Sequence, residues 1–151
     1  AHIAADQITG AILPAGSVLQ VVSHSANYST SVTANTWTDT GITLNITPTL
    51  STSKILVYVC VNGCSSNASS YMALQLLRDG VVKQLFEGQG GYTGSSDSQS
   101  FGSSVGNYLD SPSTTSAVTY KVQMKNTAGS GTCIVGESAS IHTITLMEIA
   151  V

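Results

Sequence analysis

Ile42-Thr-Leu-Asn-Ile-Thr47 and Tyr120-Lys-Val-Gln-Met-Lys125 alternate apolar and polar residues, whereas Ile55-Leu-Val-Tyr-Val-Cys-Val61 and Ile144-Thr-Leu-Met-Glu-Ile-Ala-Val151 are apolar on both faces. Strict alternation predicts strands that bury only one face. A strand that is apolar on both faces needs a cover on each, and in a small antiparallel protein the second cover is commonly another copy of the chain. The sequence therefore predicts a β protein that assembles with itself. The strand residues expected in its interface are Leu56, Tyr58, Ile144 and Leu146.

Short segments with strand character follow one another along the chain, and turn residues separate them. Asp79-Gly80 is predicted to join two of them as a two-residue hairpin, because a type I′ turn requires the positive φ that Asp and Gly tolerate. Gly88–Ser98 is rich in Gly and Ser and predicts a long exposed loop, and 108–116 predicts an ordered turn. No helix is needed. The predicted fold class is all-β, an antiparallel sandwich or jelly roll of about ten strands. The expected strands are 17–23, 31–38, 41–47, 54–61, 71–78, 81–86, 99–107, 117–125, 132–136 and 141–150.

The first residues differ from the rest of the chain. Ile3, Ile8 and Ile12 are separated by four to five residues, a spacing that fits neither a helical face nor a strand. Pro14-Ala-Gly16 then breaks the chain. We therefore expect an N-terminal arm over residues 1–13 and one domain over 14–151. Since the three isoleucines have no partner within the arm, they are expected to pack on the same residues of sister chains.

Composition excludes several classes of partner. Charged residues make up 9% of the chain, against roughly 25% in an ordinary soluble domain, and serine and threonine supply the missing polarity. With five Lys and Arg residues and a net charge of -3, no patch can neutralise a run of phosphates, so nucleic acid is not an expected partner. The longest apolar run, Ile55–Val61, is far shorter than the roughly 20 residues of a spanning helix, so no membrane insertion is expected.

Residues suited to catalysis or metal binding are sparse. No G-x-S-x-G turn surrounds any serine, and the acidic residues are scattered singly, whereas glycoside hydrolysis requires a carboxylate pair. Three cysteines leave at least one thiol unpaired. Cys60 and Cys64 have no His or Cys partners at the spacing that metal ligands need. We therefore expect neither an enzyme nor a metal or other cofactor. Cys60 and Cys64 are expected to be core or interface residues, with a disulfide between them as the alternative.

Surface recognition fits the composition better. A loop tyrosine offers a flat apolar face with a polar tip, which suits contact with a sugar or a protein, although it can equally pack on its own strand ends. If every segment reverses direction, loops alternate between the two ends of the sandwich. The loops 24–30, 48–53, 79–80, 108–116 and 137–140 would then lie far from the arm, and 39–41, 62–70, 87–98 and 126–131 beside it. The side chains in the far loops best suited to hold a sugar are Tyr28, Tyr108 and Asp110.

Several runs of residues resemble a module common in bacteriophage tail fibres and related virion proteins, especially those of marine and cyanobacterial phages. They are Thr36-Trp-Thr-Asp-Thr-Gly-Ile-Thr-Leu-Asn-Ile-Thr-Pro48, Ser53-Lys-Ile-Leu-Val57, Leu77-Arg-Asp-Gly80, Asp110-Ser-Pro-Ser-Thr-Thr-Ser-Ala-Val-Thr-Tyr-Lys-Val-Gln123 and Ile144-Thr-Leu-Met-Glu-Ile-Ala150. They occur in the same order in that module and extend over roughly residues 14–151. Residues 1–12 are similar to the last unit of the repeats that form trimeric fibre shafts.

The resemblance implies a jelly roll like those of the tumour-necrosis-factor and complement C1q families, which trimerise around a threefold axis. In those folds the early strand, here 55–61, and the terminal strand share the inner sheet that faces the axis. The implied function is a homotrimeric virion module on the exterior of the phage particle. Its expected role is as the distal domain of a tail fibre that contacts other virion proteins and binds a host surface glycan or protein.

Two other roles compete with the tail fibre. The alternative is a capsid decoration protein, or head fibre, that its arm anchors to the shell. A polysaccharide-cleaving tailspike is a third hypothesis, but the chain lacks the length and the acid pair that such an enzyme needs.

Overall fold

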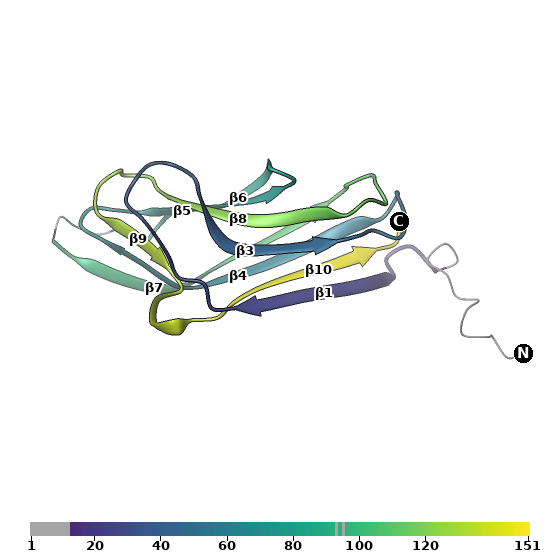
Figure 1. Ribbon diagram of the computed structural model, residues 1–151, viewed down its shortest axis with the longest axis horizontal. Helices are drawn as coiled ribbons and strands as arrows, with labels where there is room; N and C mark the ends of the chain where they lie inside the picture. Colours follow the sequence, from purple (N-terminus) through teal and green to yellow (C-terminus); the bar gives the residue numbers. More distant parts are fainter. Residues whose placement is uncertain (1–12, 93, 95) are drawn as a thin grey trace, which may run out of the picture.

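The computed structural model describes residues 13–151 except 93 and 95. Two antiparallel sheets lie face to face (Figure 1). The strands are β1 (Val18–Ala26), β2 (Thr30–Val32), β3 (Thr38–Ile46), β4 (Lys54–Asn67), β5 (Met72–Arg78), β6 (Val81–Gly90), β7 (Ser98–Asp110), β8 (Val118–Asn126), β9 (Thr132–Val135) and β10 (His142–Ile149), and Glu137–Ala139 forms the 3-10 turn η2.

The strand order is that of a jelly roll. In the larger sheet β1, β10, β4 and β7 lie side by side, and β9 and β2 continue the sheet beside the last residues of β4. The smaller sheet has the order β3-β8-β5-β6. Apart from β5 and β6, neighbours in each sheet come from distant parts of the chain, as in the double Greek key of a jelly roll. The predicted fold class is therefore confirmed, and β4 and β10 are neighbours in one sheet as expected.

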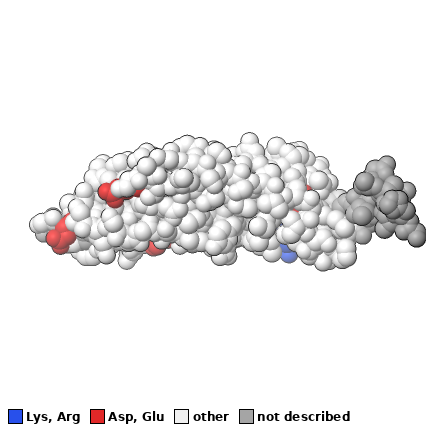
Figure 2. Space-filling model, turned by 90° about the horizontal axis from the view of Figure 1, so that it is seen from below, with Lys and Arg blue, Asp and Glu red and all other residues white. Residues whose placement is uncertain are grey.

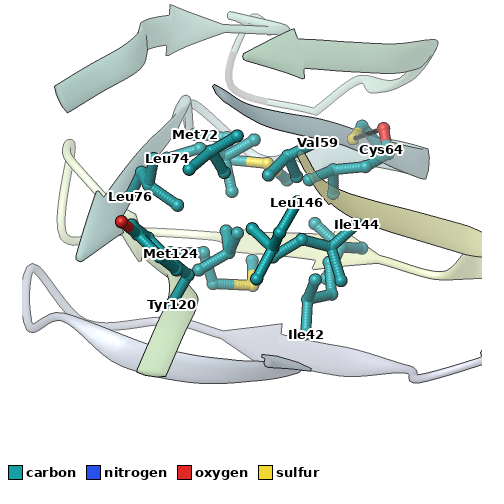
Figure 3. Packing of buried hydrophobic residues seen from close by; sticks show 14 of the residues in the cluster. Ile42, Val59, Cys64, Met72, Leu74, Leu76, Tyr120, Met124, Ile144 and Leu146 are labelled. Atoms are coloured by element: carbon teal, nitrogen blue, oxygen red, sulfur yellow. Dashed lines mark hydrogen bonds between the residues drawn. The ribbon is translucent and has the colours of Figure 1, made fainter. Parts of the chain in front are cut away.

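The core lies between the two sheets and is built by alternate residues of each strand. Ile42 and Ile46 of β3 are buried and the residues beside them are exposed or half-buried, as the alternation over 42–47 predicts. In the larger sheet Val59, Ile144 and Leu146 point into the same space (Figure 3). The buried residues of the smaller sheet opposite them include Met72, Leu74, Leu76, Tyr120 and Met124.

The hairpin predicted at Asp79-Gly80 is present. Arg78 pairs with Val81, and the two residues between them have φ values of 48° and 81°. Both lie in the left-handed region that a type I′ turn requires and that Asp and Gly adopt readily. The Asp79 carboxylate also accepts a 2.9 Å hydrogen bond from the backbone N–H of Thr119, which ties the turn to β8.

Several predicted segments have different bounds. Strand β4 continues to Asn67, past the expected strand 54–61 and through most of the expected loop 62–70. Of the strand expected over 31–38, only β2 (30–32) forms, and residues 33–37 connect it to β3. Strand β6 continues to Gly90, so the loop expected over Gly88–Ser98 is shortened to 91–97. Tyr108 and Asp110, expected in a turn, belong to the end of β7.

The assumption that every segment reverses direction is wrong at two places. β2 and β4 both lie antiparallel to β9, and β1 and β4 both lie antiparallel to β10. Consequently β1 and β2 run the same way, and so do β9 and β10. The loops 48–53, 79–80 and 108–116 therefore lie on the side of the termini, and 62–70, 87–98 and 126–131 lie on the opposite side. Loops 24–30 and 137–140 each join two strands that run in the same direction, so they lie at neither end of the sandwich.

The start of the domain and its C-terminus lie together, as Figure 1 shows at one end of the molecule. The backbone N–H of Gly16 donates to the carbonyl of Ala150 over 2.8 Å, and that of Ala150 donates to Ser17 over 2.9 Å. We call this end the terminal end. The opposite end, formed by loops 33–37, 68–71, 91–97 and 127–131, is the far end.

A buried carboxylate fastens the terminal end. Glu148 is 0% exposed, and its Oε1 accepts hydrogen bonds from the backbone N–H and hydroxyl of Thr49, each 2.8 Å, and from the N–H of Leu50 at 3.2 Å. Its Oε2 accepts a 2.6 Å bond from the side-chain amide of Gln20. Burial alone would raise the pKa of Glu148, but the hydrogen bonds to its ionised form outweigh burial and lower the pKa.

Acid is therefore expected to loosen the terminal end. Because the pKa of Glu148 is lower in the folded than in the unfolded chain, its contribution to stability is complete above the ordinary value of 4.5 and is lost as the pH falls below it. Urea unfolding at pH 7, 5, 4 and 3 should show a loss of stability below pH 4.5 that is smaller in Glu148→Gln. Asp39→Asn is the control for the other carboxyl with a lowered pKa. An identical acid limb in wild type and Glu148→Gln would contradict this account.

Candidate functional site: the outer face of the larger sheet

The face of the larger sheet that points away from the core is built in rows across four strands. Val21, Met147, Leu56 and Leu109 are consecutive partners across β1, β10, β4 and β7. The next row is Ser23, Thr145, Tyr58 and Asn107, and the one after it is Ser25, Thr143, Cys60 and Val105. Partners on one face of an antiparallel sheet stand about 5 Å apart, so the apolar members of these rows form one continuous patch.

Large apolar side chains on this face are open to solvent. Val21, Leu109, Tyr58 and Val105 are 53%, 51%, 49% and 47% exposed. Figure 2 views the molecule from the side of the larger sheet and shows a surface almost free of charged atoms, with red atoms mainly toward the end away from the grey residues. Contiguous exposed apolar patches are uncommon on monomeric proteins and mark interaction surfaces. We call this surface the apolar face.

The structure divides the predicted interface residues into two groups. Leu56 and Tyr58 lie on the apolar face, as expected. Ile144 and Leu146 do not: both are 0% exposed and point between the sheets, so they cannot contact another chain in this fold. On β10 the outward residues are Thr143, Thr145, Met147 and Ile149, which partner outward residues of β1 and β4. Ile3, Ile8 and Ile12 lie outside the described residues.

Asp110, expected to bind a receptor, is a structural residue. It is 4% exposed, and its Oδ2 accepts hydrogen bonds from Arg78 Nη1 at 2.6 Å and from the hydroxyl of Tyr120 at 2.8 Å. Lys83 Nζ lies 3.9 Å from Oδ1. Burial, followed by the neighbouring Asp110, raises the pKa of Tyr120. The group joins the ends of β5, β7 and β8 inside the sandwich, and its burial keeps the Asp110 carboxylate from contact with a sugar.

The two predicted receptor tyrosines differ. Tyr108 lies near the end of the edge strand β7, where it pairs with Val57 of β4 and packs against the core, so it is a strand residue and not a loop residue. Tyr28 remains at the surface, where its hydroxyl lies 3.1 Å from Nε2 of His24. With His24, Thr43, Leu44 and Asn45 it lines a shallow hollow of about 360 Å³.

The buried histidine has a structural role. His142 is buried, its Nδ1 accepts from the backbone N–H of Asn62 at 3.0 Å, and its Nε2 donates to the carbonyl of Tyr28 at 2.7 Å, so both ring nitrogens are used. Among the residues that the structure describes, no three His, Cys, Asp or Glu side chains are grouped to hold a metal ion.

The three thiols are free, so the Cys60–Cys64 disulfide weighed as an alternative is absent. Cys64 and Cys133 are core residues, and burial raises the pKa of Cys64 to about 12 and also raises that of Cys133. Cys60 is half-buried on the apolar face. No helix in the described part of the chain is long and apolar enough to cross a membrane.

Comparison with known proteins gives distant structural likenesses only. No family model matches the chain, and a search of curated proteins finds no match. Among solved structures, the VP2 subviral particle of infectious bursal disease virus is 13% identical with a TM-score of 0.48, over 87% of this chain and 38% of that chain. The Gx strain of the same virus gives 12% identity and a TM-score of 0.41, over 89% and 38%. The chain thus spans under two fifths of each viral protein, and their assembly is not carried over to it.

Proposed function

We propose that this chain is a non-enzymatic structural module of a bacteriophage virion, and that three copies assemble through the apolar face to form the distal domain of a tail fibre. The observation that carries the proposal is the apolar row Val21, Met147, Leu56 and Leu109, which crosses four strands on the outer face; its edge residues Val21 and Leu109 are exposed, and Met147 and Leu56 between them are half-buried. The phage identity and the threefold symmetry come from the sequence resemblance, in which the sheet containing 55–61 and the terminal strand faces the axis.

The surface composition favours burial of the apolar face. Burying apolar surface stabilises an assembly by about 25 cal/mol per Å², and uncharged side chains there avoid the cost of desolvating ions. The outer face of the smaller sheet differs, because Lys121 and Asp39 form an ion pair there at 2.9 Å and Gln123 bonds the same carboxylate at 2.7 Å. The charged groups of the smaller sheet lie on β3 and β8, whereas Val82 and Leu85 of its edge strand β6 are exposed, so the contrast between the two sheets is one of charge.

The trimer would serve attachment by multivalency. Three copies on each fibre, and several fibres on each particle, let weak contacts with host glycans or proteins add to useful avidity without new contacts. Contact with the host is then expected at the far end, because the arm and any shaft before it join the terminal end.

Cys60 provides a test of the assembly without any substitution. Its half-buried thiol lies on the apolar face, whereas Cys64 and Cys133 are 0% exposed. In the trimer we expect Cys60 to react with a thiol reagent at least ~10-fold more slowly than in dilute, dissociated protein, which corresponds to ~1.4 kcal/mol of protection. Sedimentation equilibrium on the same samples should give three times the mass of the chain. A single chain mass at all concentrations would overturn the proposed assembly.

The position on the particle tests the virion role. Gold-labelled antibody against the chain is expected to mark fibre tips on phage particles. Label on the head shell would favour the capsid decoration protein over the tail fibre, and absence of the chain from the particle would overturn the virion role itself.

A further inference from the structure

Beyond the apolar face, the larger sheet has a polar hollow toward the far end. Two adjoining cavities of about 110 and 230 Å³ share Ser100 and Glu137. Together they reach the lower limit of the roughly 300–1,000 Å³ of small-molecule sites. We call this surface the polar trough. Its strand residues come from the far parts of β4, β7 and β9, and Glu137 comes from η2; the residues on which the argument depends are Ser65, Gln99, Ser100, Thr132, Ile134 and Glu137.

An irregularity in the sheet separates the trough from the apolar face. The pairing of β4 with β7 shifts register between Val61 and Cys64 and again between Cys64 and Ser65. Such bulges bend a strand and redirect its side chains. The apolar face contains outward residues of 55–60 in β4, which precede the shift. The trough is lined by residues of 63–67, which lie at the shift and beyond it. Burying the trough in a protein interface would leave its polar groups without water, so the interface is expected to stop at the shift.

One hydroxyl in the trough has no hydrogen-bond partner among the described residues. Ser65 lines the 110 Å³ cavity, and the residue as a whole is 8% exposed. A serine hydroxyl can donate one hydrogen bond and accept two, so this one is available to a group that enters the cavity.

A carboxylate lines the same cavity with most of its hydrogen-bonding capacity free. Glu137 is half-buried, and its side chain accepts one long bond, 3.5 Å, from the hydroxyl of Ser100. A carboxylate has about four acceptor sites, and adjacent O–H groups of a ligand can fill two of them. The lining contains neither Lys nor Arg, so nothing in it would stabilise an anion.

The backbone holds Glu137 in place at some conformational cost. Ser138 and Ala139, which follow it, have φ values of 57° and 61°, in the left-handed region that non-glycine residues seldom adopt. A Cβ on Gly63 would lie 2.6 Å from the N of Glu137, so only glycine lets β4 approach this turn so closely. Strained backbone that the surrounding structure fixes is typical of ligand sites.

From these contacts we infer that the polar trough is a binding site for an uncharged saccharide. Neighbouring sugar hydroxyls donate to Glu137, the Ser65 hydroxyl and the amide of Gln99 complete the hydrogen bonding, and Ile134 contacts the apolar C–H face of the ring. The idea that this saccharide is a receptor on the host rests on the proposed attachment role. The binding chemistry itself requires only this chain. The trough, rather than Tyr28, Tyr108 and Asp110, is then the recognition surface.

Saturation-transfer NMR with neutral methyl hexopyranosides (gluco, galacto and manno), with sialic acid and glucose 6-phosphate as anionic counterparts, tests the site on the full chain. At least one neutral glycoside should bind, and the anions should not. Glu137→Gln is expected to weaken binding about tenfold or more, because bonds to a charged acceptor are the stronger ones, and Ser65→Ala several-fold. Unchanged melting temperatures would show that both variants fold. Tyr92→Ala, which alters a 64% exposed side chain near the far end outside the trough, is the matched control.

The outcomes separate this inference from the proposed function, since sedimentation of the same samples reports the trimer independently. Absence of binding by all the neutral glycosides at 10 mM (about 2.7 kcal/mol of affinity), or preference for the anions, would overturn the saccharide site whether or not the trimer forms. Binding that survives Glu137→Gln and Ser65→Ala but is lost in Tyr92→Ala would place the contact on loop 91–97 and overturn the assignment to the trough. Loss in both trough variants with Tyr92→Ala unchanged would support it.

Discussion

Tyr58→Asp is expected to convert the trimer into folded monomers. Tyr58 stands in the centre of the apolar face between Thr145 and Asn107, and it is 49% exposed in the single chain. The fold itself therefore tolerates a polar residue there. In the trimer each copy would bury one unpaired carboxylate, at a cost of about 3–5 kcal/mol each. Sedimentation velocity should show one chain mass, and circular dichroism should retain the β-sheet spectrum.

Two matched variants separate dissociation from unfolding. Leu85→Asp changes a similarly exposed apolar residue on the smaller sheet, 58% exposed, and is expected to leave the trimer intact. Leu146→Asp places the same carboxylate in the core, where the wild-type residue is 0% exposed, and is expected to unfold the chain. A Tyr58→Asp protein with the sedimentation of the wild-type trimer would refute the apolar face as the interface.

Arg78→Leu is expected to destabilise the fold by about 3–5 kcal/mol, because it leaves the buried carboxylate of Asp110 without its closest cation. Arg78 Nη1 lies 2.6 Å from Asp110 Oδ2, whereas Lys83 is 3.9 Å from the other oxygen and compensates poorly. For a chain of this size the loss corresponds to a fall in Tm of roughly 6–20 °C. Differential scanning calorimetry at pH 7 measures it directly.

The double variant Arg78→Leu with Asp110→Leu is the control. Removing both charges eliminates the uncompensated ion, and replacing a buried pair by apolar residues is often nearly neutral. The double variant should regain most of the lost stability. The part not regained is the contribution of the 2.8 Å hydrogen bond that the Tyr120 hydroxyl donates to Asp110, which the double variant also lacks. If Arg78→Leu melted within about 2 °C of wild type, a shift worth under ~1 kcal/mol, the pair would have no structural role.

Local features of the sequence predicted local structure well. The Asp79-Gly80 turn follows from the φ values that two adjacent residues can adopt, and the buried face of 42–47 follows from alternation within one strand. The two apolar faces of 55–61 are equally local: Ile55, Val57 and Val59 are buried, while Leu56 and Tyr58 point outward. Such features depend on neighbours in the chain, so they can be read from residue order.

Residue order could not show which face of the last strand is buried. In β10 the inward residues are His142, Ile144, Leu146 and Glu148, and the outward ones include Met147 and Ile149, so each face mixes polar and apolar residues. Alternation does not say which set is buried when both sets contain large apolar side chains. The register with β4 decides it, because a shift of one residue would exchange the two faces.

The candidate sites depended still more on tertiary structure. Arg78 and Asp110 are 32 residues apart, and Ser65 and Glu137 are farther apart still. No sequence motif links residues at such separations, and in a chain rich in serine nothing distinguishes Ser65 from the other serines. The loop ends were misassigned because β1 and β2 run in the same direction, which depends on the pairing of β2 with β9 more than 100 residues later. Residue order was thus enough to predict most of the strands, the tight turn and the excess of apolar surface. Which surface is exposed and which polar groups meet depends on register and strand pairing, because these bring together residues that the chain keeps far apart.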